Sequence, residues 1–399
     1  MSIKIKTIEP TDASAWDGYV HINPRSTLYH LSGWKNIIEK TYGHKTYYLM
    51  ATREPEGSQL TAQSSQLSVK NYKLSTINYQ LKVIGILPLV HLKHFLFGNS
   101  LISIPFFDLG GILADDNDTE KTLLSEAIKL AQELKAANIE LRHIYPVKFF
   151  EKDSKADLTG VYPVKPESRL AGAINPINFT TRSHKVRMLL NLPESSEILM
   201  KSFKAKLRSQ IKKPLKEGLK SKVGGVELLD DFYKVFSKNM RDLGSPVHSK
   251  ELILNVLEEF PKESRIVLVY KDDKPIACSF IVGFEDTLEN PWASALREYS
   301  RLSPNMLLYW TMLEYACDNG LKYFDFGRSS PDEGTYKFKE QWGAIPTSLH
   351  WLYISLDGQL ISKETSEKSK FERAIQYWQK LPVPVTKIIG PMIRKHIGL

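Results

Sequence analysis

The stretch NMLLYWTMLEYACDNGLKYFDFGR, residues 305–328, decides the fold that we expect for this chain. Apolar residues recur at helical spacing over 305–319, and Gly320 is placed to end that helix in a left-handed conformation. Residues 321–326 then predict a buried strand that follows directly. The same order, a helix running straight into a strand, occurs earlier over residues 119–144. The chain is therefore expected to contain two copies of one α/β unit.

Further strands are predicted before each of these helices, at 47–52, 82–91 and 101–107 in the first copy and at 265–270, 275–284 and 292–296 in the second. Aligning the copies matches Tyr48 with Val267 at an offset of 219 and Gly85 with Ala277 at an offset of 192. The two offsets differ by about the length of a polar, aperiodic stretch at 53–80. We interpret that stretch as an exposed insertion in the first hairpin.

Composition excludes several classes of protein. Of the 399 residues, 42% are hydrophobic and 25% are charged, which excludes a disordered chain. The longest apolar stretch, Val83–Val90, is far shorter than the ~18 residues that a membrane-spanning helix needs. The first residues, MSIKIKTIEPTD, hold no apolar signal core, and two cysteines, Cys278 and Cys317, do not suit a disulfide framework. We expect a cytoplasmic protein.

Length and composition predict three regions. The first unit covers 1–165, and the second covers 166–365 and includes a basic segment at 201–222. That segment holds nine basic residues and one acid, so it supplies +8 of the chain's net charge of +9. It is either a solvated helix face or a site for a polyanion such as a phosphorylated substrate, RNA or an anionic membrane. The third region, 366–399, is basic and apolar, and either packs on the first unit or rests on a membrane surface.

The order of elements resembles the GNAT acyltransferase fold, and two such units in tandem resemble the FemAB peptidyltransferase family. Four stretches carry this resemblance: RSTLYHLSGWKNIIEKTYGH at 25–44, IGILPLVHLKHFLFGNSLISIPFFDLGGILA at 84–114, FYKVFSKNMRDLGSPVHSKE at 232–251 and FDFGRSSPDEGTYKFKEQWGA at 324–344. They are most similar to the FemAB-related subgroup associated with PEP-CTERM/exosortase systems and exopolysaccharide gene clusters. The resemblance implies an α/β (α+β) fold with two tandem GNAT-like domains, each a mixed, mostly antiparallel sheet flanked by helices.

The same resemblance implies the chemistry. FemAB-like enzymes take an aminoacyl group from aminoacyl-tRNA and pass it to an amine on a cell-envelope precursor. The expected partners are therefore a phosphorylated or lipid-linked saccharide or peptide precursor and tRNA, with peripheral contact at the inner membrane. We expect neither cofactor nor metal, because His143, His184, His248 and His350 show no ligand spacing.

Direct transfer to an amine needs a cation near the developing oxyanion and a carboxylate that accepts a proton. Asp325 is the candidate carboxylate, although it could instead cap a turn or pair with Arg328, whose guanidinium suits phosphate or carboxylate. Lys337 and Lys339, which follow Tyr336, would share one side of the chain if it is extended.

The resemblance assigns the Phe338-Lys339 pair to the acyl-transfer centre, with Lys339 as the oxyanion stabiliser. It also places Lys206, Arg208 and Lys212 where related enzymes carry a phosphate-binding basic segment, although Pro214 should bend or end a helix there.

Two residues of the stretch NMRDLGSPVH, Arg241 and His248, are expected to line the acceptor cleft. Polar, glycine-containing loops often carry such sites. An equally supported interpretation is the C-terminus of a helix with Gly244 as its cap, and the two interpretations do not exclude each other.

Two other functions stay open. One is a CoA-dependent GNAT N-acyltransferase with an atypical donor site. The other is a non-catalytic module that binds RNA or an envelope component on a degenerate GNAT scaffold.

We predict no specific binding of acetyl-CoA. GNAT enzymes that use it cradle its pyrophosphate on a glycine-rich turn at a helix N-terminus, and the corresponding stretch here, 297–305, has no glycine and contains Pro304. Isothermal titration calorimetry measures this directly. Micromolar affinity would contradict the prediction and favour the CoA-dependent alternative.

Overall fold

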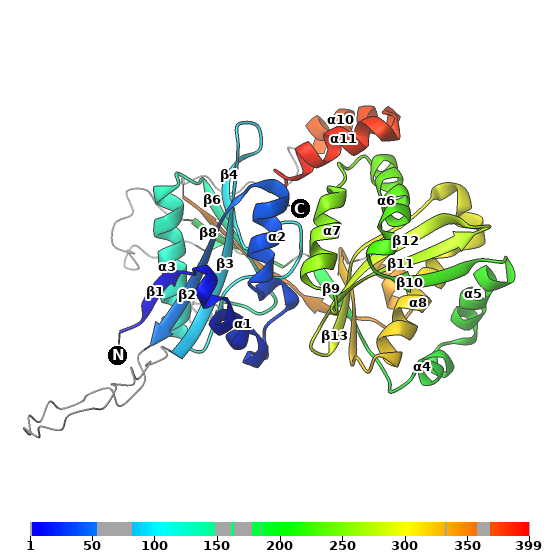
Figure 1. Ribbon diagram of the computed structural model, residues 1–399, viewed down its shortest axis with the longest axis horizontal. Helices are drawn as coiled ribbons and strands as arrows, with labels where there is room; N and C mark the ends of the chain where they lie inside the picture. The colour runs from blue at the N-terminus through cyan, green and yellow to red at the C-terminus, as the bar shows by residue number, and fades with distance from the viewer. Residues whose placement is uncertain are drawn as a thin grey trace, which may run out of the picture.

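Two mixed sheets, each flanked by helices, lie side by side along the long axis of the molecule (Figure 1). The computed structural model describes residues 2–53, 82–147, 161–162, 178–183, 185–331, 333–356 and 368–398. The expected α/β architecture of two units is confirmed. The insertion expected at 53–80 lies outside the described residues, apart from Arg53 at the end of a strand.

The first sheet has the order β1-β2-β3-β4-β6-β16-β8-β7, with β5 paired to β3. Its strands are β1 (Lys4–Thr7), β2 (Lys45–Arg53), β3 (Lys82–His94), β4 (Gly98–Ile102), β5 (Leu113–Ala114), β6 (Asn138–His143), β7 (Val161–Tyr162), β8 (Asn178–Arg182) and β16 (His350–Ser355). The second sheet has the order β10-β11-β12-β13-β14-β9-β15. Its strands are β9 (Val186–Asn191), β10 (Lys220–Gly224), β11 (Ser264–Lys271), β12 (Lys274–Phe284), β13 (Thr287–Ala295), β14 (Tyr323–Ser329) and β15 (Ile345–Ser348).

The helices cover both sheets. They are α1 (Ala13–Ile22), α2 (Gly33–Tyr42), α3 (Asn117–Glu133), α4 (Ser196–Ser202), α5 (Ala205–Lys216), α6 (Leu229–Leu243), α7 (Lys250–Glu259), α8 (Pro304–Asp318), α9 (Gly334–Glu340), α10 (Lys368–Lys380) and α11 (Val383–Arg394). One buried apolar cluster runs from α1 and α2 through to α6 and α7, and the rings of Trp34 and Phe260 lie 5.4 Å apart within it. The two units therefore share a core.

The predicted repeat is visible in the strand order. In each sheet an antiparallel hairpin, β2–β3 or β11–β12, pairs with a third antiparallel strand, β4 or β13. A helix, α3 or α8, then leads to a strand that pairs parallel to the third one, β6 or β14. The helix-to-strand signal that is repeated in the sequence thus corresponds to the parallel crossover of each unit.

The chain crosses between the two sheets twice. The chain passes from β8 in the first sheet to β9 in the second through residues 183–185, and returns from β15 to β16 through Leu349 alone. At the crossing, the Leu349 amide donates to the Lys185 carbonyl at 3.3 Å. Sheet membership therefore differs from the expected division, because β8 and β16 fall within 166–365 but belong to the first sheet.

The strand expected at 101–107 ends at Ile102, because the next residues form a tight loop. Ile104 and Phe106 have positive φ angles of 48° and 79°, which a strand does not allow. The fully buried Arg142 holds this loop, since its Nη1 donates to the carbonyls of Ile104, at 3.2 Å, and Phe107.

The C-terminal segment packs on protein. Helices α10 and α11 lie against α6, and the end of the segment reaches the first unit, where the Phe106 amide donates to the Gly398 carbonyl at 2.6 Å. Within the described residues, the structure has no helix that is both long enough and apolar enough to span a membrane.

We predict that Arg142→Leu destabilises the fold strongly. The substitution removes the donor to two loop carbonyls and leaves Glu140, which pairs with Arg142 at 2.7 Å, without its cation. Breaking a buried pair in this way typically costs about 3–5 kcal/mol of unfolding free energy. Urea denaturation checks this, with Lys129→Met as the control.

Lys129 pairs with Glu126 on the exposed side of α3. Its removal should change stability by less than about 0.5 kcal/mol. If Arg142→Leu were no more destabilising than this control, the loop would not depend on the guanidinium.

Candidate active site between the two units

A cavity of about 330 Å³ opens where β13 and β14 separate. These parallel strands pair only from Thr287–Glu289 to Tyr323–Asp325, and β14 then turns away at Gly327. Gly327 has a φ of 72°, and a Cβ there would lie 3.2 Å from the Asn290 carbonyl oxygen, so glycine suits this bend.

Both units line the cavity. The first unit supplies its 106–108 loop, and the second supplies β13, the end of β14 and α9. The polar and charged lining residues are Asp108, His248, Glu289, Asn290, Arg328, Thr335, Lys339 and Arg394.

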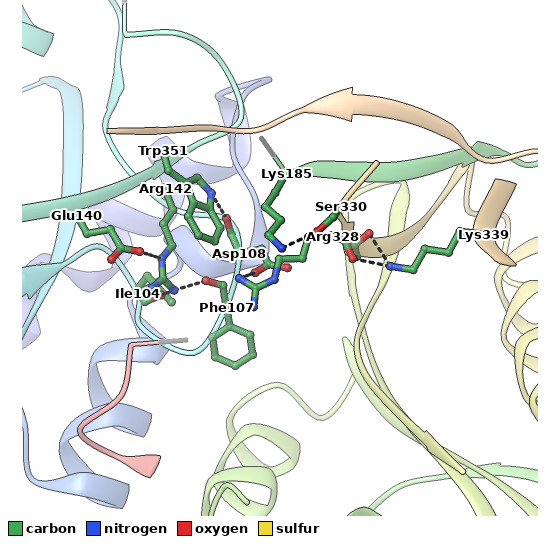
Figure 2. A network of polar contacts seen from close by, with 11 residues as sticks. Ile104, Phe107, Asp108, Glu140, Arg142, Lys185, Arg328, Ser330, Lys339 and Trp351 are labelled. Carbon is green, nitrogen blue, oxygen red and sulfur yellow. Dashed lines mark hydrogen bonds and ion pairs between the residues drawn. The ribbon is translucent and has the colours of Figure 1, made fainter. Parts of the chain in front are cut away.

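Lys339 is the buried cation of the site. Its Nζ donates to the carbonyls of Gly327 at 3.0 Å and Arg328 at 2.7 Å, and the residue is only 7% exposed (Figure 2). Burial lowers the pKa of Lys339 to about 8, although the nearby charges of Asp325 and Asp108 act in the opposite direction. The amine therefore carries its proton at neutral pH but loses it more readily than an exposed lysine.

The neighbours of Lys339 differ from expectation, because α9 is a helix and residues 334–340 are not extended. Successive side chains in a helix point in different directions, so Lys337 is exposed while Lys339 is buried. Phe338 packs edge-on against Tyr309 at 4.9 Å, and the half-buried Tyr336 packs against the core of the second unit. In the described part of the chain, the cavity lining includes none of residues 336–338.

Asp325 has both oxygens engaged. Its Oδ2 accepts from Arg187 Nη2 at 2.7 Å and Nε at 2.8 Å, and its Oδ1 accepts from the Gly327 amide at 2.9 Å. Asp325 thus caps the turn of β14, as one interpretation of the sequence held, and it pairs with Arg187 rather than with Arg328. This geometry supports a positioning role for Asp325.

Glu289 is the residue that the sequence analysis missed. It lies directly opposite Asp325 in the parallel register and is 8% exposed. Burial, followed by the charge of Asp325, raises the pKa of Glu289 well above its usual value. The expected strand began only at Trp292, whereas β13 begins at Thr287. A predicted strand that began at Thr287 would have included Glu289. Its pairing with Asp325 depends on the register of the two strands.

Arg328 connects the two units. Its Nη1 lies 3.2 Å from Asp108 Oδ1, on the loop that Arg142 holds, and its guanidinium lies over the Trp351 ring at 5.6 Å (Figure 2). Beside it, Lys185 Nζ donates to Ser330 Oγ at 2.7 Å. Cations from the second sheet and from the crossing between the sheets therefore gather near the cavity.

His248 lies in the wall of this cavity, whereas Arg241 does not, and a role for either in binding the acceptor stays a prediction. Helix α6 ends at Leu243, and Gly244 follows with a φ of 79°, so the helix-cap interpretation is confirmed. Arg241 pairs with Asp242 and donates to the Leu381 carbonyl, which fixes the C-terminal segment.

His248 is buried beside Trp292, with ring centroids 5.0 Å apart. Its Nε2 accepts from Arg394 Nε at 3.0 Å. Burial and the charge of Arg394 hold the pKa of His248 well below its usual value, so the ring is neutral. It is a fixed hydrogen-bonding wall of the cavity.

The expected phosphate-binding residues lie elsewhere, on α5, which Figure 1 shows at the side of the second unit farther from the first. Lys206 and Lys212 are exposed, and Arg208 donates to the carbonyls of Lys201 and Phe203. Helix α5 continues two residues beyond Pro214. A phosphate-binding role for these residues stays a prediction.

Neither a metal cluster nor a glycine turn marks the site. Among the described residues, no group of three or more His, Cys, Asp or Glu could hold a metal ion. Residues Arg297–Leu302 form a 3-10 helix, and Pro304 begins α8.

Comparison with known proteins identifies the fold. A family model described as an acetyltransferase (GNAT) domain matches residues 201–340. The crystal structure of FemX is similar with a TM-score of 0.58 and 14% identity over 87% of this chain and 96% of that chain. No curated protein matches.

Two other solved structures are similar at lower scores. A tandem GNAT protein from the clavulanic acid biosynthesis pathway has a TM-score of 0.49 and 10% identity over 89% of this chain and 98% of that chain. The C-terminal domain of a putative lysylphosphatidylglycerol synthetase from Agrobacterium fabrum has a TM-score of 0.44 and 12% identity over 68% and 81%. Residues 201–340 of the second unit therefore match a GNAT acetyltransferase domain, and the chain shares the fold of FemX.

We predict that the stability contribution of Lys339 depends on pH. Its folded pKa of about 8 lies below the ordinary 10.5, so between these values the unfolded chain holds the proton that the native protein has released. Native stability should therefore rise with pH across this window, by at most about 3 kcal/mol relative to Lys339→Met.

Chemical denaturation at several pH values from 7 to 10 measures the difference between the two proteins. Lys337→Met is the control, because it removes an exposed lysine from the same helix. Its free energy of unfolding relative to wild type should not change with pH in this way. The free energy of unfolding of wild type relative to Lys339→Met should increase from pH 7 to 10. If this difference does not increase, Lys339 does not have the lowered pKa that burial gives it.

Proposed function

We propose that this chain transfers an aminoacyl or acyl group to an amino group of a phosphorylated or lipid-linked cell-envelope or exopolysaccharide precursor. In this proposal the donor is aminoacyl-tRNA, as the resemblance to FemAB enzymes implies, and the resemblance to the PEP-CTERM-associated subgroup suggests the exopolysaccharide precursor. The reaction takes place in the cytoplasm, near the inner membrane. The observation that carries the proposal is the buried, carbonyl-anchored ammonium of Lys339.

Lys339 is suited to stabilise an oxyanion. An ammonium has three N–H donors, and the carbonyls of Gly327 and Arg328 take two of them. The third is available to the cavity that Lys339 lines. When the acceptor amine attacks the donor carbonyl, negative charge develops on the carbonyl oxygen, and a fixed cation in a dry site stabilises that charge.

Glu289 is suited to accept the proton. The amine forms its bond to the carbonyl carbon and becomes positively charged, and a carboxylate with a raised pKa then removes one proton. As the tetrahedral intermediate collapses, the bond from carbon to the leaving oxygen breaks, and that oxygen takes up the proton. Glu289 is ionised again at the end of the cycle. Asp325, held by Arg187, keeps the carbonyl of Gly327 in place.

The cations at the edge of the cavity suit the phosphate of the acceptor. Arg328 and Lys185 lie together with Arg142 and Arg182 along a neighbouring cleft of about 560 Å³. Among the described residues, neither Arg182 nor Lys185 forms an ion pair. Arg182 lies over the Tyr353 ring at 4.3 Å and Lys185 donates to Ser330, which leaves N–H groups of both cations for a phosphorylated group.

We predict that Lys339→Ala folds normally and loses transfer activity by about 10²–10³-fold, which is typical for removal of one oxyanion donor. Lys339→Arg should not restore the rate, because a planar fork does not replace a compact ammonium held by two carbonyls. Formation of the amide product from charged tRNA and an amine acceptor is measured by mass spectrometry.

Lys337→Ala is the matched control, since Lys337 is exposed on the same short helix. The wild-type rate should fall as pH rises through about 8, where Lys339 loses its proton. Equal rates for Lys339→Ala and Lys337→Ala would exclude Lys339 from the reaction. Faster formation of the amide product from acyl-CoA than from charged tRNA would favour the CoA-dependent alternative. The match to a GNAT domain also permits that alternative.

A further inference from the structure

The tip of the β3–β4 hairpin exposes three large apolar side chains in a row. Phe95 is 88% exposed, Leu96 is 71% exposed and Phe97 is 40% exposed. Figure 1 shows this hairpin projecting from the first unit beyond the neighbouring helices. A contiguous apolar group of this kind at a protruding tip is typical of a surface that meets an apolar phase.

Helix α11 exposes a second apolar stripe. Val385, Ile388 and Met392 are spaced three and four residues apart, so they share one side of the helix, and they are 40%, 69% and 62% exposed. The opposite side packs on protein, since a Cβ on Gly390 would lie 3.1 Å from the backbone nitrogen of Val247. The helix is therefore apolar on its buried side and also on its outer side.

The two apolar groups join into one surface. His396 lies four residues after Met392, and its ring centroid is 4.1 Å from that of His94 and 6.2 Å from that of Phe97 at the hairpin tip. In Figure 1 the hairpin tip and α11 lie on the same side of the molecule. We call this surface, made of residues 95–97 and the exposed residues of α11, the apolar face.

The two segments that carry the apolar face hold basic residues and no acids, and the nearest acids, Asp230 and Asp242, come from α6. Neither 82–107 nor 374–398 contains an aspartate or glutamate. Lys93 beside the hairpin tip, Lys380 at the end of α10 and Lys387 on α11 are exposed. Apolar side chains on segments that carry an excess of lysines complement an anionic lipid surface, because each lysine near such a surface adds attraction.

We propose that the apolar face docks on an anionic membrane, with Phe95, Leu96, Ile388 and Met392 entering the interface between headgroups and acyl chains. The apolar face adjoins both hollows of the site. Arg394 lines the cavity of about 330 Å³ that contains Lys339, and His396 and Gly398 line the neighbouring cleft of about 560 Å³. A lipid-linked phosphorylated acceptor would then reach the cations without leaving the membrane. That last step alone rests on the proposed function.

Vesicle co-sedimentation of the full chain tests the docking without any turnover. Vesicles of phosphatidylglycerol and phosphatidylcholine should bind the protein, and vesicles of phosphatidylcholine alone should bind it much more weakly. Leu96→Asp with Met392→Asp should raise the lipid concentration for half-maximal binding at least about tenfold. Both side chains are exposed, so thermal unfolding should confirm that the variant is folded.

Leu215→Asp is the control. Leu215 is 52% exposed on the basic helix α5, so it tests the other cationic surface of the chain. The proposal is overturned if wild type does not bind anionic vesicles, or if Leu215→Asp weakens binding as much as the double variant does. It is also overturned if light scattering shows a dimer that the double variant dissociates, because the face would then be covered by a second copy. If the wild-type protein binds anionic vesicles but transfers no aminoacyl group to an amine acceptor, only the proposed function is contradicted.

Discussion

The double crossing between the sheets is the constraint on which the rest of the structure depends. Because β8 continues into β9 and β15 returns into β16 through very short links, the first sheet depends on two strands, β8 and β16, that flank the second sheet in the chain. The two sheets also share an apolar core along α2 and α7. Relative movement of the units would have to break strand pairing or expose that core. Groups from both units can therefore be held at fixed positions across the junction.

The charges at the junction show what this rigidity achieves. Arg142 holds the carbonyls of the 103–107 loop, the loop presents Asp108, and Asp108 pairs with Arg328 from the other unit. The carbonyl of Arg328 in turn receives the ammonium of Lys339. A chain of contacts thus runs from the first sheet to the candidate catalytic cation (Figure 2). Buried charges are tolerated only when each has a partner in good geometry, and the fixed junction supplies those partners.

Burial then adjusts the chemistry of the site in two opposite directions. It lowers the pKa of Lys339 and raises the pKa of Glu289, so each pKa is shifted from its ordinary value in the direction of neutral pH. A carboxyl group with a raised pKa is suited to accept a proton from a substrate, while Lys339 below about pH 8 still carries the charge that an oxyanion needs. The same segment that closes the site, α11 with the residues after it, also carries the exposed apolar face. Catalysis and membrane contact would then be neighbouring properties of one part of the fold.

The sequence by itself determined the order of helices and strands and the repeat of the unit, because local periodicity records which side of each element is buried. Through resemblance to a family it also proposed Lys339 within 324–344 as a catalytic residue, and that role stays a prediction. The strand predicted from Leu101 extended too far toward its C-terminus. Ile104 and Phe106 have left-handed backbone conformations there, and no glycine in the sequence marks them. Only the tertiary structure decided that β8 and β16 join the first sheet, that Glu289 lies beside Asp325, and that Lys337 is exposed while Lys339 is buried. These features depend on pairing between residues far apart in the chain and on burial of charge, and neither leaves a local pattern in the sequence.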